Sequence, residues 1–193
     1  MNDKLLWYTT RGAGAVTLLL FSAVVVLGLL TTARFRARGW PRFVTAALHR
    51  DISLLALVFL VLHIVTAVVD PFTHLGIVAA TVPFGSYYRT FWLGLGTVAF
   101  ELMLAIVSTS LLRHLVGVRL WRIVHWLAYL SWPVAVLHGI GTGTDSSTRW
   151  MLAVTAVSVA AVLAALAWRV VVGGDPLAGD RPVGRERLAR TAR

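Results

Sequence analysis

The sequence predicts an all-α membrane protein, a bundle of about five transmembrane helices, and three observations support this. Apolar residues make up 58% of the 193 residues, charged residues only 13%, and the mean hydropathy is +0.79. Soluble domains are roughly half apolar and a quarter charged, and a chain of this size has too little interior to bury the excess. The apolar residues also gather in long stretches separated by short Arg-rich segments. Lipid is therefore the expected solvent.

Five apolar stretches reach the length of about 20 residues that crosses a bilayer. They cover residues 12–32, 43–69, 91–112, 121–140 and 149–172. A sixth apolar stretch, residues 75–84, is too short to cross and ends in Pro83-Phe84-Gly85. We expect it to be an interfacial or re-entrant part of a loop. Residues 1–172 are thus the expected membrane core, and residues 173–193 a disordered basic tail.

The orientation follows from the positive charges. Fourteen of the 18 Lys and Arg residues fall on one side of the predicted spans and four on the other. The four are Lys4, Arg11, Arg89 and Arg149. Because Lys and Arg accumulate in cytoplasmic loops, we expect the N-terminus outside and the C-terminus in the cytoplasm. The same arrangement argues against nucleic acid as the partner of the net charge of +10, and it indicates a multi-pass protein of the plasma (cytoplasmic) membrane.

The absence of cysteine narrows the chemistry. Disulfides, thiolate catalysis, iron–sulfur clusters and Cys-ligated zinc are all excluded. The histidines are the candidates for the functional site, because four of the six fall inside predicted spans. His49 and His63 lie in the second span, and His125 and His138 in the fourth.

The spacing of these histidines places them at two matching depths. His49 and His63 are 14 residues apart and His125 and His138 are 13 apart, which corresponds to about 21 and 19.5 Å of helix rise. Both spans run in the same direction under the expected topology, so each helix offers one imidazole near each membrane face. Haem held between facing helices by an axial imidazole from each side needs this arrangement.

Other interpretations of the histidines remain open. A single intramembrane histidine often only forms an interhelical hydrogen bond, and histidines together with Glu101 could conduct protons. The rotational phase is also imperfect, because 13 residues fall about 140° short of four full turns, against about 40° for 14 residues. Pro133 lies between His125 and His138, and we expect it to kink or re-phase that helix.

Two segments resemble a known family. They are LHRDISLLALVFLVLH (48–63) and RIVHWLAYLSWPVAVLHGIGTGTD (122–145), and they are similar to the ferric reductase-like transmembrane family of NADPH oxidases, ferric-chelate reductases and MsrQ/YedZ-type haem subunits. The resemblance implies two b-type haems, with iron ligated by His49 and His125 near the cytoplasmic face and by His63 and His138 near the external face. Full-length oxidases and reductases add a flavin and NAD(P)H domain, whereas here only about twenty residues follow the last span. The resemblance therefore implies a haem subunit of an oxidoreductase that depends on a flavoprotein or another redox partner, and it leaves open a flavin bound at the membrane surface.

Cations near the histidines are candidates for binding haem propionates, because Arg offers paired donors to carboxylates. The candidates are Arg50 and Arg122 on the cytoplasmic side and Arg11 and Arg89 on the external side. Glu101 lies deep in the third span, where we expect it to be protonated, paired or bonded to a ligand imidazole, with a possible role in proton uptake. His74 and His114 are expected to be bystanders.

The function predicted from the sequence is electron transfer across the membrane from a cytoplasmic donor to an external acceptor. Iron with two histidine ligands has no open position, so it would relay electrons without binding a substrate. The alternatives are a haem-free proton-conducting channel or transporter subunit and a non-catalytic membrane anchor.

Overall fold

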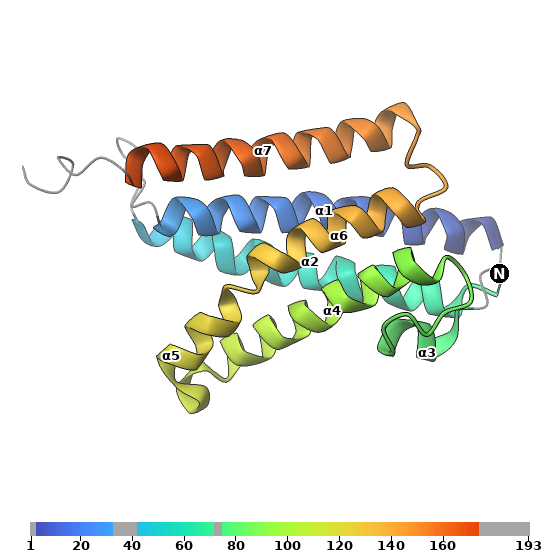
Figure 1. Ribbon diagram of the computed structural model, residues 1–193, viewed down its shortest axis with the longest axis horizontal. Coiled ribbons are helices and arrows are strands. Elements are labelled where there is room, and N and C mark those ends of the chain that lie inside the picture. The colour runs from blue at the N-terminus through green and yellow to red at the C-terminus, as the bar shows by residue number, and fades with distance from the viewer. Residues whose placement is uncertain (1–2, 33–41, 72–74, 174–193) are drawn as a thin grey trace, which may run out of the picture.

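The protein folds into a bundle of α-helices. The computed structural model describes residues 3–32, 42–71 and 75–173, which form seven helices and, within these ranges, no strand (Figure 1). The helices are α1 (Asp3–Thr32), α2 (Arg42–Val69), α3 (Gly76–Thr81), α4 (Thr90–Leu111), α5 (Arg113–His125), α6 (Ala128–Thr142) and α7 (Arg149–Gly173). Four of these helices are long and apolar enough to cross a membrane, and α5 with α6 forms a bent pair that brings the number to five. The predicted fold class is confirmed.

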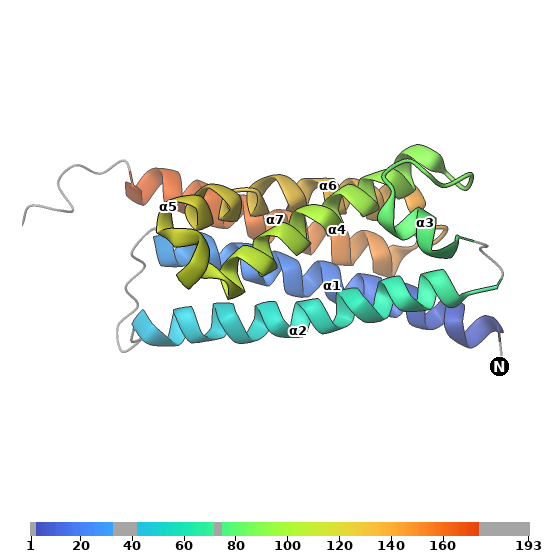
Figure 2. The same ribbon diagram turned by 90° about the horizontal axis from the view of Figure 1, so that it is seen from below.

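Helix α1 lies at the centre of the bundle and contacts α2, α6 and α7 (Figures 1 and 2). A buried cluster joins α1 to α7, with Phe21, Val25 and Leu29 packed against Val162 and Ala165. Helix α4 packs on α6 on the other side of the bundle. The chain enters α1 and leaves α7 at opposite ends of the bundle (Figure 1), as an odd number of crossings requires.

The first helix begins earlier than the sequence predicted. The prediction started the span at Gly12, after a polar stretch, whereas α1 already begins at Asp3. The polar side chains are satisfied by the helix itself: Thr9 Oγ1 donates to Leu5 O over 2.7 Å and Thr10 Oγ1 to Leu6 O over 3.0 Å. The Arg11 guanidinium lies 4.2 Å from the centre of the Trp7 ring, one turn back. Hydroxyls bonded in this way do not terminate a helix.

The fourth predicted span is broken, and the break is not at Pro133. Helices α5 and α6 meet at an angle of 49°, with the break at Trp126 and Leu127, while Pro133 lies inside α6. The amides of Leu127, Tyr129 and Leu130 each bond to the carbonyl three residues earlier. Such short-range bonds tighten the helix beyond 100° per residue. The helix is therefore interrupted at this tightened turn, before Pro133.

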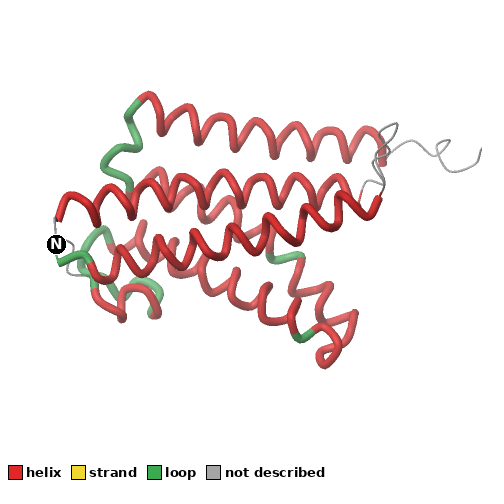
Figure 3. The backbone as a smooth tube through the Cα atoms, turned by 180° about the vertical axis from the view of Figure 1, so that it is seen from behind, coloured by secondary structure: helices red, strands yellow, loops and turns green. Residues whose placement is uncertain are grey.

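Helix α5 changes direction at a glycine. Gly117 adopts φ 77° and ψ 157° inside α5, a conformation that side-chain-bearing residues rarely adopt. It lets the first residues of α5 change direction at the end of the bundle, before the chain continues toward His125. In Figure 3 the break between α5 and α6 is the short green segment nearer the middle of the bundle, and the one below it joins α4 to α5, whereas the α6–α7 loop lies at an end of the bundle.

The short apolar stretch 75–84 does not cross the bundle. It forms the six-residue helix α3 and a turn, and it packs against α2 and α4. Thr97 Oγ1 of α4 donates to Ala79 O over 2.8 Å, and a methyl group on Gly94 would collide with the Phe84 ring. The predicted tail lies outside the described residues, from residue 174 onward.

Candidate functional site

The four histidines predicted as ligands meet in two pairs. The ring centroids of His49 in α2 and His125 in α5 are 6.1 Å apart, and those of His63 in α2 and His138 in α6 are 6.4 Å apart. The ring planes within each pair are inclined by 62° and 79°. The sequence predicted these partners, and the structure brings them together at both depths.

The spacing within each pair fits an iron atom bound between the rings. Metal–imidazole bonds of about 2 Å place two coordinating rings with their centroids about 6 Å apart. Both measured separations lie close to this value. The residues present therefore fit haem iron with one axial imidazole on each side.

The alignment of the second partners depends on the break between α5 and α6. His125 is the last residue of α5, and His138 lies in the last turns of α6. On one straight helix these two side chains would point about 140° apart. The tightened turn and the 49° bend between them bring both rings to face α2.

Three of the four rings are fixed by hydrogen bonds to main-chain carbonyls. Nδ1 lies 2.7 Å from Thr10 O in His63, 2.9 Å from Trp92 O in His138 and 3.1 Å from Val24 O in His49. A carbonyl can only accept, so Nδ1 carries the hydrogen in each case. The lone pair is then on Nε2, the nitrogen that remains free to bind a metal.

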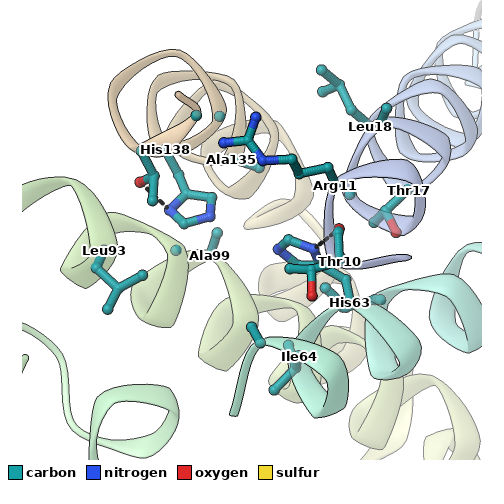
Figure 4. A pocket seen from close by; sticks show the side chains of 18 of the residues that line it. Thr10, Arg11, Thr17, Leu18, His63, Ile64, Leu93, Ala99, Ala135 and His138 are labelled. Carbon is teal, nitrogen blue, oxygen red and sulfur yellow. Dashed lines mark hydrogen bonds between the residues drawn. The ribbon is translucent and has the colours of Figure 1, made fainter. Parts of the chain in front are cut away.

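A cavity of about 410 Å³ lies between His63 and His138. Its walls come mainly from α1, α2, α4 and α6, with further residues from α3 and α7, and are mostly apolar, with Leu60 and Phe100 among the lining side chains. Figure 4 shows the two imidazoles pointing toward one another from opposite sides of this space. The volume is in the range of cavities that hold a small ligand or cofactor.

Arg11 is the predicted propionate-binding cation that lines this cavity. Its side chain lines the cavity and extends from α1 toward α6 (Figure 4). It forms an ion pair with Asp145 and a hydrogen bond to Thr144, both in the loop after α6. Arg11 thus joins the start of α1 to this loop at the mouth of the cavity.

The other three predicted arginines are held differently. Arg89 Nη1 donates to Gly141 O over 2.6 Å, so it caps the end of α6, where exposed carbonyls favour a cation. Arg50 is exposed and pairs with its neighbour Asp51 over 2.9 Å. Arg122 is an exposed residue of α5, one turn before His125.

The remaining predicted residues do not join the pairs. The Glu101 side chain is exposed on α4 and is not among the residues that line the cavity. His114 is exposed in the first turn of α5. His74 lies outside the described residues.

Sequence reasoning missed three glycines that contact the histidine rings. A methyl group on Gly14 would lie 2.9 Å from His63 Nδ1, one on Gly96 2.5 Å from His138 Nδ1, and one on Gly28 3.5 Å from His49 Cε1. A signal was present in the sequence, because Gly14 and Gly28 are 14 residues apart, as are His49 and His63.

Comparison with known proteins identified one family. No curated protein and no solved structure matches the chain. The family described as ferric reductase like transmembrane component matches residues 13–136, more than half of the chain. The matched region contains His49, His63 and His125 and ends two residues before His138. The chain belongs to the ferric reductase-like transmembrane component family.

Proposed function

We propose that this protein transfers electrons across the membrane through two b-type haems, one held by His49 and His125 and the other by His63 and His138. The observation that supports this most strongly is the pair of ring separations, 6.1 and 6.4 Å, because both fit iron with two imidazole ligands. When bound, each haem would supply a one-electron carrier with no open iron position.

The protein's own groups would prepare each site for this cofactor. The carbonyls of Thr10, Val24 and Trp92 hold three imidazoles with Nε2 free, so little rearrangement is needed to bind iron. The apolar walls between His63 and His138 would exclude water from the redox centre. The 14-residue spacing on α2 separates the two sites by about 21 Å of helix rise, so together they span most of a hydrocarbon core of about 30 Å.

Arg11 is the strongest candidate for binding a propionate, because its guanidinium lines the cavity beside His63 and His138. Its ion pair with Asp145 would keep this cation in place before the cofactor arrives. Arg89 lies at the same end of the bundle, and Arg50 and Arg122 lie close in sequence to the other pair. These three are weaker candidates, since Arg89 does not line the cavity and Arg50 and Arg122 are exposed.

The direction of transfer is proposed from the charge distribution. Fourteen of the 18 Lys and Arg residues belong to the side of His49 and His125, which we assign to the cytoplasm. Electrons would then enter from a cytoplasmic flavoprotein or another redox partner and leave near His63 and His138 to an external acceptor. A reporter fused after Arg193 should be active in the cytoplasm and one inserted at Asp145 outside, and the reverse pattern would exchange the two sites.

The proposal is tested by a reduced-minus-oxidised absorption spectrum of the purified full-length protein. We expect the sharp bands of low-spin b-type haem, and the same spectrum in His114→Ala, because His114 belongs to neither pair. A folded protein without these bands would refute the proposal and favour the haem-free proton pathway or the membrane anchor.

A further inference from the structure

Each hydrogen bond from a ligand ring to the backbone is accompanied by a glycine one turn further along the same helix. His63 bonds to Thr10 O, and Gly14 lies four residues after Thr10. His49 bonds to Val24 O, and Gly28 lies four residues after Val24. His138 bonds to Trp92 O, and Gly96 lies four residues after Trp92. The same four-residue relation therefore occurs three times, on two different helices.

Helix geometry explains why glycine occupies these positions. A carbonyl inside a helix already accepts the amide four residues later, so a second donor must approach it from the helix surface. The side chain of that later residue points back toward the N-terminus and covers this approach. Glycine has no such side chain. The clearances agree, since a methyl group on Gly14 would lie 2.9 Å from His63 Nδ1 and one on Gly96 2.5 Å from His138 Nδ1.

The repeat on α1 has the same length as the ligand spacing on α2. Thr10 and Val24 are 14 residues apart, as are Gly14 and Gly28, and these helices pack side by side. Each α2 ligand thus meets an equivalent position on α1. The equal 14-residue spacings on α1 and α2 are present whether or not a cofactor is bound between the histidines.

The fourth ligand lacks this arrangement. Adding 14 residues to Trp92 and Gly96 gives Ile106 and Ser110, and Ser110 Oγ instead accepts Trp121 Nε1 over 3.2 Å. Within the described residues, His125 Nδ1 is buried and has no hydrogen-bond partner. Its ring lies 5.2 Å from that of Trp121.

We propose that Gly14, Gly28 and Gly96 are positioning residues that open the carbonyls of Thr10, Val24 and Trp92 to three ligand imidazoles, and that His125 is the one ligand without this support. The consequence for iron rests on the proposed function. A hydrogen bond to the second ring nitrogen fixes the tautomer and increases the donor strength of a ligand imidazole. The His63–His138 iron would have two such ligands and the His49–His125 iron one.

The first test compares three glycines of the same helix. Gly14→Ala should raise the reduction potential of one haem and alter its low-spin EPR signal, because the methyl group displaces His63 from Thr10 O. Gly28→Ala should have a smaller effect, since 3.5 Å is an ordinary contact. Gly12→Ala, where a methyl group meets nothing within 4 Å, should change neither haem. Equal effects of Gly14→Ala and Gly12→Ala would overturn the proposal.

The second test uses the full-length wild-type protein without haem. Nitrogen-15 NMR of the histidine side chains, assigned with single His→Gln variants, should show the Nδ1–H tautomer for His49, His63 and His138 and a mixture for His125. The same tautomer population in all four rings would refute the inference. This result does not depend on cofactor binding, so the inference and the haem proposal can fail separately.

Discussion

The two histidine pairs have nearly equal ring separations but unequal surroundings. His63 and His138 both bond to main-chain carbonyls, both lie tightly against a glycine, and a cavity of about 410 Å³ separates them. In the other pair only His49 has such a bond, and its glycine leaves room for a methyl group. His125 is the last residue of α5, directly before the helix break.

This difference shows that nearly equal ring separations can be held by backbone segments that are constrained to different degrees. His63 and His138 lie within continuous helical segments that pack on α1 and α4, so the geometry is fixed by packed backbone. His125 depends on a helix that turns at Gly117 and breaks at Trp126. We therefore expect the His49–His125 site to be the more easily disturbed by changes in the connecting segments.

The largest expected effect comes from removing the ligands themselves. His63→Ala and His138→Ala should each eliminate one of two haems, and the double variant should lose little more, because both imidazoles serve one iron. His49→Ala and His125→Ala should eliminate the other haem. Haem content and separate redox titrations would check this. Additive losses within a pair would contradict the assignment of partners.

A substitution at Gly117 should distinguish the two sites. Its φ of 77° with ψ of 157° costs a residue with a side chain about 1–3 kcal/mol, so Gly117→Ala should shift the turn that leads to His125. The expected result is partial loss of the His49–His125 haem with the other haem retained, measured by redox titration. Gly12→Ala is the control, because a methyl group there meets nothing within 4 Å and Gly12 does not line the cavity. Preferential loss of the His63–His138 haem would contradict the comparison.

Substitutions of Arg11 and Asp145, which form an ion pair beside the cavity, should shift the reduction potential of one haem by smaller amounts and in opposite directions. Arg11→Gln removes a positive charge and should lower the potential of the His63–His138 haem, because a nearby cation favours the reduced state. Asp145→Asn removes the paired negative charge and should raise it. The other haem should respond less to both changes. Shifts of the same sign, or larger shifts at the distant haem, would be inconsistent with this position of the ion pair.

The smallest effect is expected for Glu101→Gln. Its side chain is exposed on α4 and does not line the cavity. The reduction potentials of both haems in the variant should therefore equal those of the wild type at every pH between 6 and 8. A pH-dependent shift in either potential would instead support the proton-handling role considered from the sequence.

The sequence predicted most of the fold because long apolar stretches are a strong signal of membrane helices. It located α2, α4 and α7 to within one residue at each end, and it predicted which histidines meet. It placed the start of α1 too late because Thr9 and Thr10 satisfy their hydroxyls within the helix. It also attributed the break to Pro133, since hydrogen bonds three residues apart leave no mark in composition.

The support around the ligands was harder to predict for a physical reason. The acceptors are main-chain carbonyls, which every residue carries, so only the glycines beside them are visible in a sequence. Those glycines become meaningful once α1 is known to pack on α2, and Gly96 once α4 is known to pack on α6. Likewise, periodicity could not tell whether Glu101 faces the ligands or the outside of the bundle.

The most direct test of the central claim is the amount of haem per polypeptide. A pyridine haemochrome assay on the purified full-length protein, combined with quantitative amino-acid analysis, measures this ratio. The two histidine pairs predict two b-type haems per chain. A ratio of one in a fully loaded, folded protein would mean that one pair does not bind iron, and a ratio of zero would contradict the account as a whole.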